Sequence, residues 1–196
     1  MYSIRSSQIE KILPFKSNGL KKLTTKQILR RNQERSSPLA DQFILWLHDI
    51  RSLHNVGAAF RCADAFGIKE LWLSGFTPTP PRPEITKTAI GAEEHVSWEK
   101  IEDESEAIQQ LKKNNYTILG LEQTENSFPL QDYKITENPI CLILGNEVTG
   151  IDQKLLNQLD AAIEIPQFGM KHSLNVSVAA GVALFAFFEK FESNPG

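Results

Sequence analysis

Short apolar runs alternate with helical patterns over residues 43–191, and this alternation restricts the possible folds more than any other feature of the chain. The apolar runs have the length of buried strands and are bounded by polar residues. They are Phe43–Leu47, Glu70–Leu73, Tyr116–Leu121, Ile140–Leu144 and Ala161–Ile165. Helical patterns cover residues 55–66, 103–114, 152–159 and 175–191, and a short helix with a brief strand around Val96 is expected within residues 84–98. Strands and helices in this order predict an α/β fold, in which helices cover both faces of a parallel sheet.

The size and composition of the chain are those of an ordinary globular protein. With 196 residues it can form one domain with a full core, and 41% of its residues are hydrophobic and 23% charged. No apolar run approaches the ~20 residues that a membrane-spanning helix needs. The N-terminal residues carry charges and lack an apolar run, which argues against a secretory signal.

Charge is distributed unevenly along the chain. Residues 1–40 contain nine basic and two acidic residues, a net charge of +7, so the remaining residues must carry −10 of the total of −3. We therefore divide the sequence into a basic N-terminal helical extension, residues 1–40, and a body, residues 41–196. The extension can be interpreted as an arm that binds a polyanion or as a solvated helical face, and charge alone leaves both interpretations open.

Cysteine, histidine and tryptophan usage adds few functional signals. Cys62 and Cys141 lie among apolar neighbours without metal-ligand spacing, which predicts buried free thiols, no metal site and a reducing cytoplasm. All tryptophans are expected in the core, and no histidine is assigned a role. These residues are Trp46, Trp72, Trp98, His48, His54, His95 and His172.

Polar clusters follow three of the predicted strands, where ligands bind in open parallel sheets. The first cluster, residues 51–61, follows Phe43–Leu47 and opens a helix. Asn55 stands where an N-cap is expected, which would explain it without any function. Arg61 lies among small residues on the same helix, and this setting indicates close approach by another group.

The second cluster, residues 145–150, follows Ile140–Leu144 and places Glu147 in a turn between two glycines. Glycine lets a ligand approach the backbone closely, although a plain strand-to-helix turn would have the same residues. The spacing matches neither the dinucleotide-binding glycine motif nor the phosphate-binding loop. A dinucleotide or ATP site is therefore disfavoured.

The third cluster, residues 165–181, leads from the end of a strand through a glycine turn into a helix of small residues. Ser173 and Asn175 stand at the start of this helix, where they could act as N-caps. The free N–H groups and positive dipole end of a helix also suit a polar ligand. The small residues beyond permit close packing, either inside the chain or between two chains.

Taken together, the three clusters resemble the motifs of the SpoU/TrmH family of RNA ribose 2′-O-methyltransferases, within the SPOUT class. Residues 55–61 are similar to the first motif of that family, residues 145–150 to the second and residues 165–181 to the third. The similarity extends over about residues 42–190 and includes residues 87–92 between the motifs. Three motifs in order and at the family's spacing make a specific match.

The resemblance implies that residues 41–196 form a SPOUT catalytic domain with a deep C-terminal trefoil knot. It implies a homodimer whose subunits complete each other's sites, S-adenosyl-L-methionine as cofactor, and methylation of a ribose in structured RNA. The matching cofactor-binding positions are Leu121, Glu122, Gly145, Ile165 and Leu174. The matching catalytic positions are Arg61, Asn55, Glu147, Ser173 and Asn175.

Within this resemblance, Arg61 is expected to grip an RNA phosphate and orient the hydroxyl, with Asn55 holding Arg61 in place. A compact body with a basic arm favours tRNA over rRNA as the substrate. A non-catalytic RNA-binding dimer that keeps the same fold is the alternative, and the presence of all five polar residues makes it the less favoured one.

Overall fold

A computed structural model describes residues 20–193 of the chain. It divides the chain into two compact units, Met1–Arg35 and Ser36–Gly196. In the first unit, helix α2 (Thr25–Gln33) begins with a capping box in which Thr24 Oγ1 accepts from Gln27 N and the Gln27 side chain accepts from Thr24 N. None of the nine residues of α2 is buried. The part of the predicted helical extension in residues 1–19 lies outside the described residues.

The second unit contains a seven-stranded sheet in which every pair of neighbouring strands is parallel, as predicted. The order across the sheet is β3-β2-β1-β6-β4-β7-β5. The short strand β5 was not predicted. The strands are β1 (Phe43–His48), β2 (Glu70–Ser74), β3 (Ser97–Ile101), β4 (Thr117–Leu121), β5 (Phe128–Pro129), β6 (Ile140–Leu144) and β7 (Ala161–Glu164).

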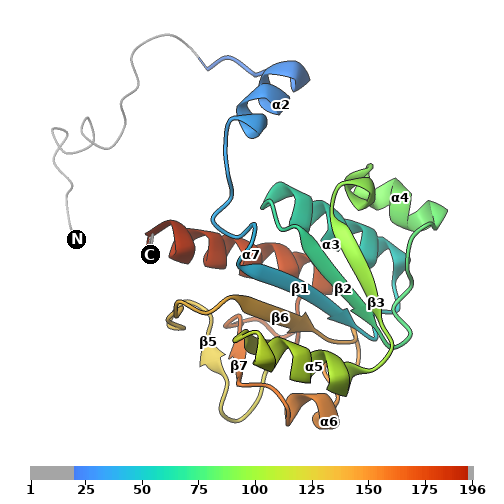
Figure 1. Cartoon of the computed structure of the whole chain (residues 1–196), viewed down its shortest axis with the longest axis vertical. Helices are drawn as coiled ribbons and strands as arrows, with labels where there is room; N and C mark the ends of the chain where they lie inside the picture. The colour runs from blue at the N-terminus through green and yellow to red at the C-terminus, as the bar shows by residue number, and fades with distance from the viewer. Residues whose placement is uncertain (1–19, 194–196) are drawn as a thin grey trace, which may run out of the picture. The chain divides into compact units, whose positions relative to one another are not determined.

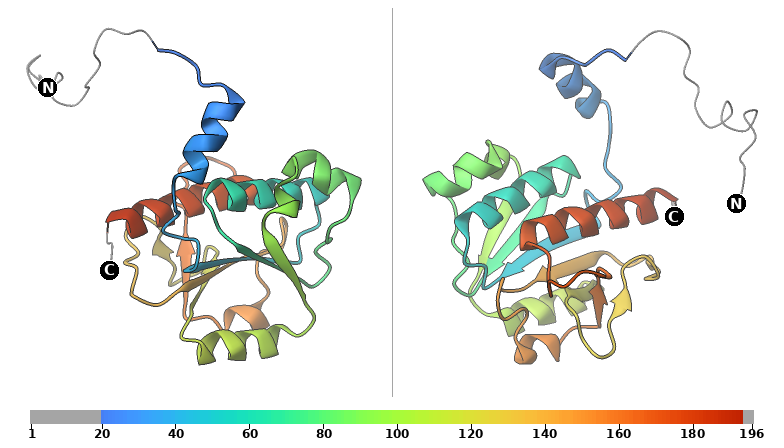
Figure 2. Two further views of the ribbon diagram at one scale, coloured as in Figure 1. Left: turned by 45° about the horizontal axis from the view of Figure 1, so that its top comes forward. Right: turned by 180° about the vertical axis from the view of Figure 1, so that it is seen from behind.

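Helices connect these strands and cover both faces of the sheet (Figures 1 and 2). Helices α3, α4 and α7 lie on one side, with α4 packed against α3, and α5 and α6 lie on the other. The helices are α3 (Leu53–Ala65), α4 (Pro83–Ala89), α5 (Glu104–Lys113), α6 (Gln153–Leu156) and α7 (Val176–Ser193), with a 3-10 turn η1 (Ala92–Glu94). No helix in the described part of the chain is long and apolar enough to cross a membrane.

The period-two alternation of a strand divides the core into two layers. In β1, the side chains of Leu45 and Leu47 belong to the core under α3 and α7, whereas Ile44 and Trp46 belong to the core under α5 and α6. All four side chains are almost fully buried. A central strand of a sheet covered on both faces must therefore be apolar throughout, which explains its continuous apolar run.

Two tryptophans pack as predicted and the third does not. Trp46 and Trp72 are buried and make an edge-to-face contact, with ring centroids 5.4 Å apart. Trp98 is 37% exposed, so its predicted place in the core is wrong. It lies on β3, the edge strand of the sheet, where the helices cover neither face completely.

The close approach expected around the small residues of the first cluster comes from within the chain. A Cβ atom added to Gly57 of α3 would lie 2.4 Å from the Ile85 carbonyl oxygen of α4 and 2.0 Å from Thr88 Oγ1. Helices α3 and α4 therefore pack with almost no space between their backbones. Because all strands are parallel, their carboxyl ends share one edge of the sheet, and the three polar clusters meet there.

Candidate active site

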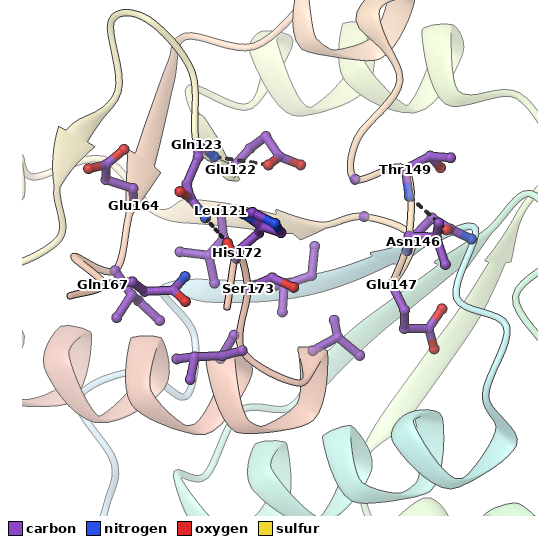
Figure 3. Close-up of a pocket in the computed structure, with 18 residues that line it drawn as sticks. Leu121, Glu122, Gln123, Asn146, Glu147, Thr149, Glu164, Gln167, His172 and Ser173 are labelled. Atoms are coloured by element: carbon purple, nitrogen blue, oxygen red, sulfur yellow. Dashed lines mark hydrogen bonds between the residues drawn. The ribbon is translucent and has the colours of Figure 1, made fainter. Parts of the chain in front are cut away.

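A cavity of about 300 Å³ opens at the carboxyl ends of β4, β6 and β7 (Figure 3). Its walls combine apolar side chains with the backbone of two loops, residues 145–150 and residues 165–174. All five positions matched to cofactor binding line it, together with Glu147 and Ser173 of the catalytic set. The five are Leu121, Glu122, Gly145, Ile165 and Leu174.

The loop at residues 145–151 is tightly closed on itself. The backbone N–H and C=O groups of Asn146 and Gly150 bond to each other at 3.0 and 2.9 Å. The Asn146 Oδ1 atom accepts from the backbone N–H groups of Val148 and Thr149 (Figure 3). Gly145 lies against this ring, because a Cβ atom there would be 2.3 Å from both Gly150 C and Ile151 N. Only glycine fits at position 145 without moving the loop.

Glu122 shapes the cavity wall through its carboxylate. Its Oε2 atom accepts a hydrogen bond of 2.9 Å from Ile151 N, and its Oε1 atom accepts one of 2.9 Å from Gln123 N. These bonds tie the 145–151 loop to the end of β4. The part of Glu122 in the cavity wall is therefore held in place by the protein itself.

Residues 165–174 form the facing wall of the cavity. Gln123 Nε2 donates a hydrogen bond of 2.8 Å to the His172 carbonyl oxygen, which ties this loop to the segment after β4 (Figure 3). Ser173 lines the cavity and forms no hydrogen bond within residues 20–193, so the N-cap interpretation of Ser173 is wrong. Earlier in the same loop, the side chains of Phe168 and Met170 are 98% and 97% exposed.

Glu147 reaches from the 145–151 loop to the beginning of α3. Its carboxylate accepts hydrogen bonds from Arg51 N at 2.9 Å, from Ser52 N at 3.0 Å and from Asn55 Nδ2 at 2.9 Å. Partial burial of Glu147 raises the pKa of this carboxyl. The hydrogen bonds to its charged form together lower the pKa by more than burial raises it, so the pKa lies below its ordinary value. A negative charge is also favourable beside the N-terminus of a helix.

Asn55 does not cap its helix, so the N-cap interpretation of this residue is wrong. The N-cap of α3 is Ser52, whose side chain accepts from Asn55 N. The Asn55 side chain is thereby available for other partners: Nδ2 donates to Glu147, and Oδ1 accepts from Asn175 Nδ2 at 3.0 Å. Asn55 forms no hydrogen bond with Arg61 within the described chain, contrary to the expectation that it holds this arginine.

Asn175 is both a cap and a member of the polar cluster. Its Oδ1 atom accepts from Ser177 N at 3.0 Å and from Ser177 Oγ at 2.6 Å, which confirms the capping prediction. Its Nδ2 atom donates to Asn55. A continuous chain of hydrogen bonds therefore runs from Glu147 through Asn55 to Asn175, and it joins segments that lie 92 and 120 residues apart.

Arg61 stands apart from this cluster. It is exposed on α3, does not line the cavity and forms no hydrogen bond or ion pair with residues 20–193. The next residue, Cys62, faces α7, with Sγ 3.9 Å from the Ser177 carbonyl oxygen. Both cysteines are free thiols as predicted, although Cys62 is only partly buried. In the described residues, no group of three or more His, Cys, Asp or Glu side chains could hold a metal ion.

Replacing Glu147 with glutamine is expected to lower the melting temperature by about 2–4 °C at pH 7, since hydrogen bonds to a charged acceptor are lost. A carboxyl with a lowered pKa in the folded state stabilises the fold above its unfolded pKa of about 4.3, and this contribution disappears as the pH falls. The difference from the wild type should therefore shrink towards pH 3. Calorimetry at both pH values tests this, and an equal difference at pH 7 and pH 3 would contradict it.

Comparison with known proteins identifies the family of the chain. A model of the SpoU rRNA Methylase family matches residues 42–185, most of the sequence. The chain belongs to this family. The match confirms the resemblance carried by the three motifs. The parallel α/β sheet confirms the predicted fold class at the level of the sheet.

Individual relatives show the same relationship. The chain is 33% identical over 159 residues to a tRNA (guanosine(18)-2'-O)-methyltransferase of Thermus thermophilus, covering 81% of this chain and 77% of the relative. It is 29% identical over 160 residues to a 23S rRNA (guanosine-2'-O-)-methyltransferase of Acinetobacter baylyi, covering 81% and 61%. The crystal structure of a TrmH/SpoU tRNA modifying enzyme from A. aeolicus has a TM-score of 0.74 and 25% identity, and the alignment covers 86% of this chain and 84% of that one.

Some residues of the site were missed at the level of sequence. Gln123 ties the 165–174 loop to the segment after β4, and Asn146 closes the 145–151 loop, but neither was singled out. Asn146 stands between Gly145 and Glu147, so its position beside a predicted site was visible. The reach of Gln123 to His172 depends on contacts between distant segments and has no local signal.

Proposed function

We propose that this protein transfers a methyl group from S-adenosyl-L-methionine to a ribose 2′-hydroxyl of structured RNA. The observation that carries this proposal is that the 145–151 loop belongs both to the cavity and to the polar cluster of Glu147, Asn55 and Asn175. One side of the loop lines the cavity, and its Glu147 side chain anchors the Asn55–Asn175 hydrogen-bond chain. A cofactor pocket and a polar substrate site would then be separated by a single loop. Membership of the SpoU family supports the same chemistry.

The cavity suits the proposed cofactor in size and in lining. Its volume of about 300 Å³ lies at the lower end of the range for small-molecule sites. Gly145 leaves the backbone accessible, so that Gly145, Ile165 and Leu174 could bind largely through backbone groups, with Leu121 and Glu122 beside the adenosyl part. When bound, S-adenosyl-L-methionine supplies a methyl group on a positively charged sulfur.

The residues of the chain would hold and orient the RNA. A guanidinium has a pKa above ~12, so Arg61 is a poor proton acceptor but a good bidentate ligand for a phosphate. Ser173 lines the cavity with a hydroxyl that bonds to no residue among 20–193, and Asn175 holds the turn beside it. The Glu147 carboxylate would complement positive charge near the reacting groups. Positioning of this kind can supply up to about 7–11 kcal/mol of a barrier.

We also propose that the protein acts as a homodimer in which Arg61 reaches the cavity of the partner subunit. Three apolar side chains on one face of α7 are exposed: Val178 at 51%, Val182 at 41% and Phe185 at 51%. Their spacing along the helix makes one continuous stripe that a second copy could cover. Arg61 lies outside the cavity of its own chain, on the helix that packs against α7. The trefoil knot that the resemblance implies stays a prediction.

Among RNA substrates we favour tRNA, and among compartments the cytoplasm. One relative is named for tRNA and another for 23S rRNA, so the comparisons support either class. The compact body and the basic arm favour the smaller RNA. The non-catalytic RNA-binding dimer remains the alternative, although no specific observation favours it.

The direct test is incubation of the full chain with radiolabelled S-adenosyl-L-methionine and total RNA, followed by separation of the RNA classes and mass spectrometry of the labelled nucleoside. We expect label in the tRNA fraction, in a nucleoside methylated at the ribose 2′-oxygen. Label in rRNA alone would overturn the choice of tRNA. Cofactor and RNA binding without transfer would support the non-catalytic alternative, and absence of cofactor binding would reject the proposal.

Deletion of residues 1–35 is expected to weaken RNA binding and to flatten its salt dependence, if the basic arm binds phosphates. Each phosphate contact that is lost should lower the slope of log K against log salt by about 0.7–0.9. Filter binding between 50 and 200 mM salt measures this slope. The double variant Lys26→Gln with Arg31→Gln removes only two of the positive charges and should flatten the slope less than the deletion. Both side chains are exposed in α2 and neither takes part in its capping box, so the helix should be kept. An unaltered slope would assign the arm to dimerisation or to solvation.

A further inference from the structure

A polar network with a buried centre and an exposed end at Asp152 lies on the α5 and α6 side of the sheet, outside the cavity described above. At its centre is His48, the last residue of β1, which is only 6% exposed. Its Nδ1 atom lies 2.7 Å from Ser74 Oγ, and its Nε2 atom lies 3.1 Å from Asp152 Oδ2. Trp46 Nε1 donates to the same Ser74 oxygen at 2.8 Å. Both nitrogens of the ring are therefore bonded.

The chemistry of these groups decides which of them donate. An indole N–H can only donate, so Ser74 Oγ accepts from Trp46 and its own hydrogen is available for His48 Nδ1. The Asp152 carboxylate can only accept, so His48 Nε2 carries the proton towards it. Asp152 Oδ1 in turn accepts from Leu155 N and caps α6. The chain of hydrogen bonds thus runs from Trp46 of β1 to Ser74 of β2, back to His48 of β1 and on to the start of α6.

The order Ser74–His48–Asp152 has the composition of a hydrolytic triad, but not its accessibility. Ser74 has no exposed surface, and its oxygen accepts from Trp46. A nucleophile must reach its substrate, which this serine cannot do. The network therefore has no nucleophile that a substrate can reach, and its role is to hold other parts of the protein in place.

The network reaches Asp152, the residue that directly follows the 145–151 loop. Two hydrogen bonds attach the loop itself to residues at strand ends: Asn146 Nδ2 donates to the Asp49 carbonyl oxygen at 2.7 Å, and Ile151 N donates to Glu122. A third contact, between Asp152 and His48, holds the residue that directly follows the loop. Two of the three contacts thus involve the end of β1, since His48 is its last residue and Asp49 directly follows it. The loop is the wall between the cavity and the Glu147 cluster, so a shift at Asp152 would be felt on both sides of it.

We propose that His48 is a positioning residue that holds the 145–151 loop in the conformation that binds the cofactor. This inference rests on the proposed function, because it assigns the cavity to S-adenosyl-L-methionine. Three carboxylates face the ring: Asp152, Asp49 with Oδ2 at 3.5 Å from Nε2, and Glu104 with Oε1 at 3.8 Å from Nδ1. Two of them, Asp152 and Asp49, lie on the Nε2 side of the ring, where His48 donates to Asp152.

The test compares His48→Gln and Ser74→Ala with the wild type, using calorimetric titration with S-adenosyl-L-methionine and the melting temperature of each protein. We expect the cofactor Kd to rise about tenfold in His48→Gln and at least threefold in Ser74→Ala. In labelled-methyl assays, the KM for the cofactor should rise by a larger factor than kcat at saturating cofactor falls. His95→Gln is the matched control, because His95 is exposed and lies outside the cavity and the network.

The outcomes separate this inference from the proposed function. A wild-type protein that binds no S-adenosyl-L-methionine overturns the proposed function and this inference with it. Wild-type binding with an unchanged Kd in both folded variants overturns only the role of His48, even if their melting temperatures fall. If His48→Gln does not fold, Ser74→Ala alone decides, because it removes one hydroxyl and leaves the imidazole and Asp152 in place.

Discussion

The variant Arg61→Ala is expected to lose about 10²–10³-fold in turnover while its affinity for S-adenosyl-L-methionine stays within a factor of two, a loss typical of removing one preorganised electrostatic contact. Arg61 does not line the cavity, so its removal leaves the proposed cofactor site intact. Its guanidinium is exposed and forms no bond with residues 20–193, which leaves its donors available for a phosphate. Single-turnover methyl transfer and calorimetric titration of the cofactor measure the two quantities separately.

Two further variants sharpen this prediction. Arg61→Lys keeps the positive charge but not the planar pair of donors, so part of the activity should return. Lys113→Ala removes an exposed cation from the last turn of α5, on the opposite side of the sheet, and should have wild-type turnover. Unchanged turnover in Arg61→Ala would remove this residue from the proposed machinery.

Replacement of Gly145 by alanine is expected to weaken cofactor binding by about 100-fold or more, equivalent to about 2.8 kcal/mol. The added methyl group would lie 2.3 Å from Gly150 C and 2.5 Å from the Gly150 carbonyl oxygen, which are backbone atoms that cannot rotate away. The whole loop must therefore shift. Since this loop lines the cavity and carries Glu147, both the cofactor Kd and the rate of transfer should change.

Gly169→Ala provides the matched control for the effect of adding a methyl group at a glycine. Gly169 lies in the facing loop, and a Cβ atom there would meet nothing within 4 Å. We expect the Gly169→Ala protein to bind the cofactor within twofold of the wild type. A Gly145→Ala protein with wild-type affinity would show that the 145–151 loop does not bound the cofactor site. Circular dichroism distinguishes a moved loop from a lost fold.

The order of the elements could be predicted because it rests on local patterns. Apolar runs predicted five of the seven strands within one residue at each end, and the helices on each side followed from the 3.6-residue period. Burial of side chains at the edge of the sheet was harder to predict. Trp98 is as apolar as Trp46, but only its place on the outermost strand leaves it exposed. Strand order is a property of long-range pairing, which the period of a single strand does not encode.

The same limit applies to the site. Asn55 has the residue type and the local position of an N-cap, and the sequence offered that interpretation. Ser52 takes the cap because α3 begins two residues earlier, and this frees the Asn55 amide for Glu147 and Asn175. His48 was assigned no role, since a lone histidine at the end of a strand carries no signal. Its partners Ser74 and Asp152 lie 26 and 104 residues away.

By itself, the sequence determined the class of fold, the presence of three polar clusters at strand ends and, through their resemblance, the family. These depend on residue type and spacing along the chain. Only the tertiary structure decided which polar atoms meet: Glu147 with Asn55, Glu122 with Ile151, and His48 with Asp152. It also placed Arg61 outside its own cavity. Parallel strands bring distant loops to one edge of the sheet, and the contacts there depend on the packing of the whole core.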